Sequence, residues 1–132
     1  MAVPGYQSVM LPLLRFAGDE KEHTISEAVD ALALHFKLID DDRKELLSSG
    51  LQTRFGNRVG WARTYLKKAR LLESTGRGAF LITQRGLELL KTKPPEINAK
   101  SLRKFPEFTE FMNLSSQGNR HDGEETKVDQ TP

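Results

Sequence analysis

The chain contains no cysteine, a single tryptophan and no long apolar run. Without cysteine it can form neither a disulfide framework nor a thiolate metal site, which favours an intracellular protein. Its first 18 residues lack a basic start, and Pro12 interrupts their short apolar run, so they predict neither a signal peptide nor a membrane span. We therefore expect a cytoplasmic chain that does not enter a membrane.

Acidic residues are also missing from one segment. No acid lies between Glu45 and Glu73, whereas six arginines and lysines do. Residues 46–87 carry a charge of +7, against −4 for residues 1–45 and −1 for residues 88–132, in a chain with a net charge of only +2. Ordinary surface helices mix both signs. The segment therefore predicts a local positive potential that suits an anionic partner, the alternative being a solvated cationic helix face.

The sequence offers no arrangement of residues for catalysis or metal binding. Its three histidines are far apart and lack ligand-like spacing: His23, His35 and His121. A metal-dependent nuclease needs an acid and an acid-x-lysine motif on adjacent strands. The nearest matches, Glu125-Thr126-Lys127 and Asp42-Arg43-Lys44, fall in a polar tail and in a predicted helix. We expect no catalytic residue, metal or cofactor in this chain.

Apolar spacing and capping signals predict helices in the first part of the chain. A first helix covers about Tyr6 to Phe16, and a second begins at Thr24, which forms a capping box with Glu27. A short third helix has Asp40 or Asp41 as its N-terminal cap and stops at Gly50.

A fourth helix runs from about Asn57 to Ala69 and is expected to have two different faces. At 100° per residue the apolar positions form a buried face, made of Val59, Ala62, Leu66 and Ala69. The opposite side is expected to face outward, with Arg63 on its flank, and holds Asn57, Gly60, Trp61, Thr64, Lys67 and Lys68.

A β-hairpin is predicted to follow this helix. Leu71 to Ser74 and Ala79 to Thr83 resemble strands, and the glycine-rich turn between them carries Arg77 at its tip. Thr83 then caps a further helix, which the prolines at 94 and 95 terminate.

These elements predict a mainly α fold with a small β-hairpin, arranged as a winged helix-turn-helix. In such folds one helix enters the major groove of DNA and the wing lies along the backbone. Arginines and lysines would neutralise phosphates, Asn57 suits adenine, and an arginine suits guanine. The candidate DNA-binding residues are Arg54, Asn57, Arg58, Gly60, Arg63, Thr64, Lys67, Lys68, Arg70 and Arg77.

Four of the residues in this region allow two interpretations. Gly60 lies in a helix interior, where glycine costs about 1 kcal/mol relative to alanine, so either a DNA backbone or a crossing helix comes close to it. Trp61 and Tyr65 either pack inside the fold or contact DNA. Arg77 either reaches a phosphate or the minor groove, or is a solvated turn residue.

Five segments resemble the N-terminal domain of Mrr-type restriction endonucleases over about residues 1 to 112: "VPGYQSVMLPLLR", "SSG", "NRVGWARTYLKKARLLES", "RGAFLITQRG" and "FPEFTEF". The residues that match the family motif are Asn57, Arg58, Gly60, Trp61 and Lys67. The resemblance implies a winged-helix DNA-binding module of a prokaryotic restriction system. It also implies a linker to a C-terminal nuclease domain, which would need a divalent metal such as Mg²⁺ and would cut modified DNA.

This resemblance and the composition together predict the domain organisation. Residues 1–93 form the winged-helix domain, which at this length has one small core. Residues 94–112 form a helical extension, with Phe105, Phe108 and Phe111 spaced for a helical turn, that packs on the domain or on a partner. Residues 113–132 are a disordered tail or a linker to a missing nuclease domain. The chain is then a fragment of a longer protein or a short natural relative.

Our leading hypothesis is a module that places a restriction nuclease on double-stranded DNA and catalyses nothing itself. One alternative is a free-standing winged-helix transcriptional regulator that uses the same surface. Another is a protein-interaction module in which "FPEFTEF" mediates homodimerisation or docking of the nuclease.

Overall fold

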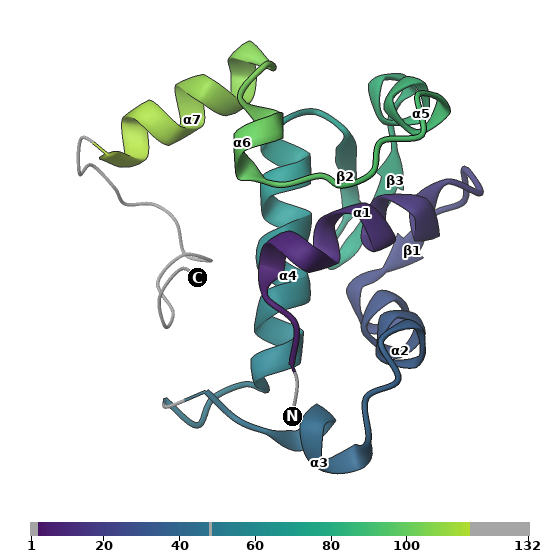
Figure 1. Cartoon of the computed structure of the whole chain (residues 1–132), viewed down its shortest axis with the longest axis vertical. Coiled ribbons are helices and arrows are strands. Elements are labelled where there is room, and N and C mark those ends of the chain that lie inside the picture. Colours follow the sequence, from purple (N-terminus) through teal and green to yellow (C-terminus); the bar gives the residue numbers. More distant parts are fainter. Residues whose placement is uncertain (1–2, 48, 117–132) are drawn as a thin grey trace.

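The computed structural model describes residues 3–47 and 49–116 (Figure 1). Ten elements follow one another along the chain: α1 (Tyr6–Ala17), β1 (His23–Thr24), α2 (Ile25–His35), α3 (Asp40–Lys44), α4 (Arg54–Lys68), β2 (Leu72–Gly76), β3 (Ala79–Ile82), α5 (Gln84–Lys91), α6 (Ala99–Leu102) and α7 (Pro106–Ser116). The predicted mainly α fold with a small hairpin is confirmed. Within this part of the chain, no helix is both long and apolar enough to cross a bilayer.

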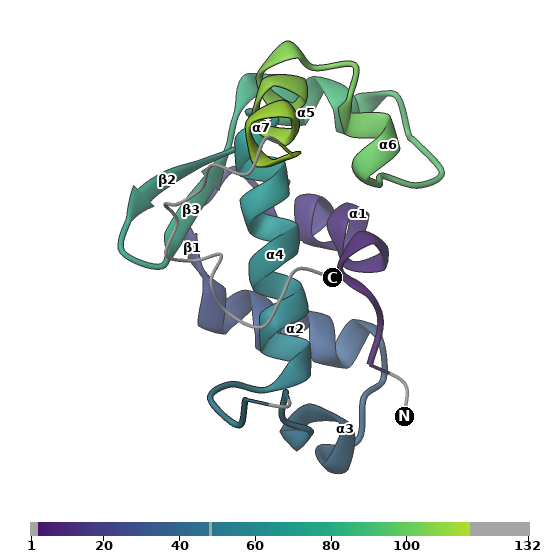
Figure 2. The ribbon, with the colours of Figure 1, turned by 90° about the vertical axis from the view of Figure 1, so that its left-hand side faces the viewer.

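Helix α4 is the centre of the fold. Helix α1 crosses it and makes the most extensive contact with it, while α2, α7 and β2 pack against it as well (Figures 1 and 2). The four residues predicted for its buried face are all fully buried: Val59, Ala62, Leu66 and Ala69. The apolar periodicity therefore identified the face of α4 that meets the core.

Side-chain caps fix where several helices begin. The backbone N–H of Glu27 donates to Thr24 Oγ1 at 3.2 Å and that of Thr24 donates to Glu27 Oε1 at 3.1 Å, so the predicted capping box is confirmed. Helix α4 begins at Arg54 rather than at Asn57, because Thr53 caps it by accepting from the N–H of Gly56 at 3.0 Å.

The third helix is shorter than predicted. It ends at Lys44 instead of continuing to Gly50, and Ile39 rather than an aspartate occupies its N-cap position. The chain then folds back on itself, because Arg54 N–H donates to Glu45 O at 2.7 Å. Gly50, with a φ of +74°, belongs to this turn, which we call the 45–54 loop. Long-range backbone pairing has replaced the last turns of the predicted helix.

The hairpin is part of a three-stranded antiparallel sheet with the order β1-β3-β2. In the hairpin Leu72 lies opposite Ile82, with an irregularity between Ser74 and Gly76. The two residues of β1 pair with the other edge of β3, where His23 lies opposite Phe80. The sequence predicted only two strands, because a two-residue strand leaves no alternating pattern to read.

Helix α5 packs closely against the hairpin at Gly86. Its predicted cap is confirmed, since Thr83 Oγ1 accepts from the N–H of Gly86 at 3.1 Å. A Cβ on Gly86 would collide with the backbone oxygen of Leu71 and would lie 2.7 Å from Cγ1 of Ile82. Only glycine therefore allows α5 to approach the hairpin so closely.

Helix α7 packs on the outer part of α4. Phe108 is fully buried, and its ring centroid lies 5.5 Å from that of Tyr65. The helix continues to Ser116, so residues 113–116 are helical and do not belong to the tail predicted from residue 113. Its residues 117–132 lie outside the described part of the chain. The short helix α6 was not predicted.

Candidate nucleic-acid interface

One line of positions stays partly open to solvent along α4. Gly56, Gly60, Arg63 and Lys67 are all partly exposed, and their spacing of four, three and four residues stacks them on one side of a helix with 3.6 residues per turn. We call these four residues the α4 stripe. Its first two residues are glycines, which leave the backbone bare, and its last two residues are positively charged.

Two projections lie beside α4. In Figure 2, where α4 runs vertically, the β2–β3 hairpin and the 45–54 loop both extend to the left of the helix. The tip of the hairpin is fixed to the start of α2, because Ile25 N–H donates to Gly78 O at 2.8 Å. The hairpin is therefore held at its tip by the start of α2 and at its base by the chain connection to α4.

The outward orientation predicted for Asn57 and Thr64 is wrong. Only 4% of the Asn57 surface and 3% of the Thr64 surface are exposed, and Asn57 Oδ1 accepts from Nη1 of Arg58 at 3.1 Å. A helical wheel assumes one packed face, whereas α4 is contacted by several elements, which cover Asn57 and Thr64 as well. We leave both residues out of the interface, since a buried side chain cannot reach a base.

Trp61 and Tyr65 lie in the core. They are 6% and 5% exposed and their ring centroids are 5.9 Å apart, edge to face. Tyr65 also meets the ring of Tyr6 at 5.0 Å. Burial raises the pKa of Tyr65, so its hydroxyl stays protonated. Of the two interpretations open for these aromatic residues, packing is the arrangement that the structure has.

Gly60 has open space beside it. A Cβ built on this residue meets nothing within 4 Å, so no described helix crosses α4 here. The interpretation of Gly60 as a helix-crossing residue is therefore wrong. Glycine lowers the stability of the helix here, and no described neighbour occupies the space beside it. Gly60 therefore leaves bare backbone for an external partner.

The cations at the start of α4 have internal partners. Arg54 Nε lies 3.0 Å from Oε2 of Glu45, and both side chains are partly exposed. Arg58 donates to Asn57, and burial, followed by the charge of Arg54, lowers its pKa. An arginine nevertheless remains charged at neutral pH. These two residues contribute positive potential near α4, although the structure engages their guanidinium groups in other contacts.

Arg63 and Lys68 point to different sides of α4. Arg63 belongs to the α4 stripe, and its buried Nε has no hydrogen-bond partner within the described residues. Lys68 is exposed, but its Nζ lies 5.1 Å from the ring centroid of Phe111 on α7. The structure therefore places Arg63 on the exposed line and turns Lys68 toward α7.

Two further exposed cations follow α4 along the chain. Arg70 is exposed immediately after α4, and it shares a cleft with Lys67. Arg77 is exposed at the tip of the hairpin. The structure thus brings Arg63, Lys67 and Arg70 together and places Arg77 beyond them on the hairpin.

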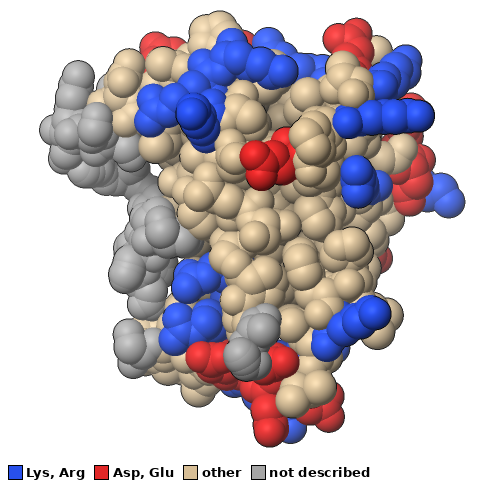
Figure 3. All heavy atoms as spheres, in the orientation of Figure 1, with Lys and Arg blue, Asp and Glu red and all other residues tan. Residues whose placement is uncertain are grey.

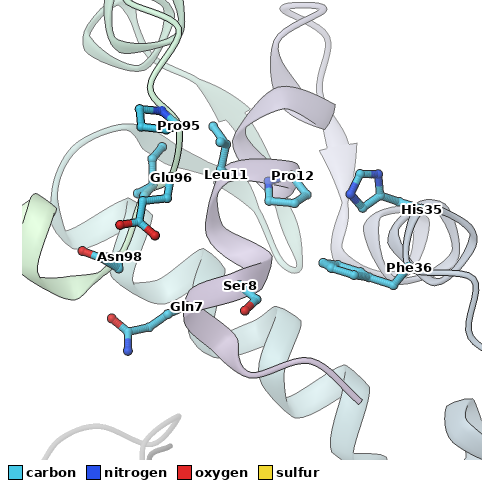
Figure 4. A pocket seen from close by; sticks show the side chains of 10 residues that line it. Gln7, Ser8, Leu11, Pro12, His35, Phe36, Pro95, Glu96 and Asn98 are labelled. Carbon is cyan, nitrogen blue, oxygen red and sulfur yellow. The ribbon is translucent and has the colours of Figure 1, made fainter. Parts of the chain in front are cut away.

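The face that carries α1 has a different character. In Figure 3 its centre is mostly uncharged, and Lys and Arg lie around its edges. A hollow of about 430 Å³ lies there between α1, the end of α2 and the segment before α6 (Figure 4). Glu96 lines this hollow, and no lysine or arginine does. This face does not suit a polyanion.

The comparisons with known proteins agree with the resemblance. Residues 6–92 match the Mrr N-terminal domain family. This chain belongs to that family. Over 95 residues it is 34% identical to the type IV methyl-directed restriction enzyme EcoKMrr of Escherichia coli K12. The aligned part covers 71% of this chain but only 31% of that enzyme. No solved structure matches the chain.

The matched region of the Mrr N-terminal domain contains the candidate interface. It extends from α1 to the end of α5 and so includes α4 and the hairpin, while α6 and α7 follow it. Within residues 3–47 and 49–116 of the chain, no group of three or more His, Asp or Glu could hold a metal ion.

Three residues of this Mrr N-terminal domain were not predicted as site residues. Gly56 lies one turn before Gly60, and that spacing was visible in the sequence. Gln84 and Arg85 line the same cleft as Lys67. They begin a separate helix, and no local pattern indicates that this helix meets the end of α4.

Proposed function

We propose that this Mrr N-terminal domain is a winged helix-turn-helix module that binds double-stranded DNA. The observation that carries the proposal is the partly exposed α4 stripe, which ends in two cations and whose last residue, Lys67, lines one cleft with strand β2 of the hairpin. Figure 2 shows the hairpin projecting beside α4. The order of helices and strands from α1 to β3 supports it. In this arrangement α4 faces the major groove and the hairpin lies along the backbone.

The dimensions of α4 fit a DNA groove. Gly56 and Lys67 are separated by about 16 Å along the axis, from a rise of 1.5 Å per residue, and the major groove is about 12 Å wide. A helix of this length therefore reaches from one side of the groove to the other. The bare backbone at Gly60 allows the helix to approach the DNA closely.

Base reading in this proposal rests on Arg63 rather than on Asn57. Arg63 is partly exposed in the middle of the α4 stripe, and a guanidinium group can donate two hydrogen bonds to guanine. Lys67, Arg70 and Arg77 contact phosphates, which supply affinity without sequence information.

The relative suggests the larger protein in which such a module would act. EcoKMrr is described as a methyl-directed restriction enzyme, so we extend the proposal to a parent protein in which a C-terminal nuclease domain, using a divalent metal such as Mg²⁺, cuts modified DNA. The present domain would then place that nuclease on its target. Binding to methylated and unmodified duplexes of one sequence would show which domain recognises the modification.

The interaction-module alternative loses its main residue. It relied on the segment "FPEFTEF", in which Phe108 is fully buried within this chain. Phe108 is therefore not available to hold a second copy or another domain.

A pair of charge-neutralising variants tests DNA binding. Arg63→Gln combined with Lys67→Gln should weaken duplex binding about tenfold or more. The slope of log Kd against log salt should decrease by the contribution of about two phosphate contacts. The control combines Lys68→Gln with Arg103→Gln, which removes the same charge from exposed positions off the α4 stripe. Fluorescence anisotropy over a salt series measures both.

Two results would contradict the proposal. One is a wild-type affinity for duplex DNA that does not decrease as salt increases. The other is equal binding by the α4-stripe pair and its control.

A further inference from the structure

A cleft of about 530 Å³ lies where the end of α4, strand β2 and the start of α5 meet. Its polar lining comes from all three regions: Lys67, Arg70, Glu73, Ser74, Thr83, Gln84 and Arg85. Because β2 is an edge strand of the sheet, one side of the cleft is open. The cleft continues from the α4 stripe, because Lys67 belongs to both.

Positive charge dominates this cleft. Three cations line it, against the single acid Glu73. Nη1 of Arg85 donates to Ala69 O at 2.9 Å and to Glu107 Oε1 at 2.9 Å, so Arg85 is fixed and partly neutralised. Arg70 is exposed. The cleft therefore combines a fixed guanidinium group with an accessible one.

The start of α5 adds neutral hydrogen-bond donors. The Thr83 hydroxyl accepts from the N–H of Gly86, and the Thr83 carbonyl accepts from the N–H of Leu87. The N–H groups of Gln84 and Arg85 precede the first intrahelical hydrogen bond, and helix N-termini attract anions. The Gln84 side chain is exposed at the same place, and its Nε2, which donates to Glu88 Oε2 at 3.3 Å, carries a second hydrogen that it can donate. Donors and cations from separate elements thus converge on one opening.

This convergence identifies a chemical class of ligand. We propose that the cleft binds one phosphate group of the DNA backbone and anchors the end of α4 at the edge of the major groove. The proposal rests on the DNA-binding function proposed above. It assigns Arg70 and Gln84 to phosphate contact, with Arg85 as a positioning residue held by Glu107.

The distance along α4 favours a backbone phosphate over a free anion. Gly60 and Lys68, the last residue of α4, are separated by about 12 Å along the axis, which matches the width of the major groove, about 12 Å. Arg70 follows two residues after the end of the helix. When Gly60 faces the floor of the groove, the cleft lies near the phosphates that border it. A free anion would not need the cleft to be continuous with the α4 stripe.

Neutralising Arg70 tests the phosphate contact. Arg70→Gln should weaken duplex binding about fivefold or more, reduce the salt dependence by about one phosphate contact and leave the ranking of DNA sequences unchanged. Arg70→Lys should restore most of the salt dependence. The control is Lys91→Gln, which removes one exposed charge at the far end of α5. Thermal unfolding of each variant verifies that the fold is intact.

The backbone amides of Gln84 and Arg85 provide a second measurement. In a ¹⁵N-labelled wild-type chain, a short duplex should shift both amide resonances, and inorganic phosphate at the same concentration should not. If inorganic phosphate shifts them and the duplex does not, the cleft holds a free anion and the phosphate-contact proposal is overturned.

The outcomes separate this proposal from the proposed function. If the Arg63 and Lys67 pair weakens binding but Arg70→Gln binds like wild type, the cleft proposal is overturned and DNA binding stands. If the wild-type chain binds no duplex, or binds it without salt dependence, the proposed function itself is overturned.

Discussion

The burial of single residues on α4 shows where apolar spacing predicts packing and where it does not. Val59 and Leu66 are buried as their spacing predicted, whereas Asn57 and Thr64 are buried despite their polarity. Apolar periodicity reports the face that meets the main core, because exclusion of apolar groups from water drives that contact. It does not report which polar positions further packing covers.

Gly60 gives the sharpest prediction for a single residue. Gly60→Ala should stabilise the fold by up to about 1 kcal/mol, because alanine favours helix and its Cβ meets no described atom. The same methyl group should weaken duplex binding by separating α4 from the DNA. Urea unfolding and fluorescence anisotropy measure the two effects.

The control for this variant is Gly86→Ala, which should destabilise the fold because its Cβ collides with the backbone of Leu71. If Gly60→Ala binds DNA as tightly as wild type, close approach at Gly60 is excluded.

Individual elements were predictable where their boundaries depend on local contacts. Thr24 and Thr83 were identified as caps because each bonds an N–H three residues away. Strand β1 and the end of α3 were not predictable, since both depend on distant partners. Strand β1 exists because Thr24 pairs with Ala79, and α3 ends where the chain turns back toward α4.

His23 joins several of these elements and makes their stability depend on pH. Its Nε2 lies 2.9 Å from Asp19 Oδ1, its Nδ1 lies 3.1 Å from Glu27 Oε1, and its ring lies 4.3 Å from that of Phe16. Burial alone would lower the pKa of His23, but the hydrogen bonds to the two carboxylates outweigh it and raise the pKa above the ordinary value of 6.5.

The sign of the pH effect follows from that raised pKa. The folded chain holds the His23 proton more tightly than the unfolded chain, so this stabilisation is complete below about pH 6.5 and is lost as the pH rises through the folded-state pKa. The wild-type chain should therefore have a larger free energy of unfolding than the His23→Gln variant. This difference should be greatest at acidic pH and should shrink at alkaline pH. Urea unfolding from pH 5.5 to 8.5 measures it. A difference that grows with pH would contradict this assignment.

At the scale of the whole molecule, α7 completes the packing around α4. Phe108 and Phe111 meet the ring of Tyr65 at 5.5 and 5.9 Å, and Arg85 on α5 pairs with Glu107 at 2.9 Å. The sequence predicted that this segment packs on the domain or on a partner. Within the described residues it packs on the domain, beyond the region that matches the family.

This arrangement predicts the effect of removing the Phe108 ring. Phe108→Ala should destabilise the fold by about 3–5 kcal/mol, the usual cost of emptying a buried aromatic site. It should leave the oligomeric state of the folded protein unchanged, because the ring is buried within one chain. Urea unfolding and analytical ultracentrifugation measure the two properties.

The matched control is Phe111→Ala, which removes a partly exposed ring and should cost less stability. If Phe108→Ala keeps its stability but changes a dimer into a monomer, the interaction-module reading is restored.

The sequence by itself determined the caps of α2 and α5, the hairpin, the buried face of α4 and the concentration of positive charge between Glu45 and Glu73. These features depend on residues that are neighbours along the chain. Only the tertiary structure decided which part of α4 stays exposed, that a third strand joins the hairpin, and that Arg70 and Gln84 share one cleft. Each of these depends on how distant segments pack together, and that packing leaves no local pattern in the sequence.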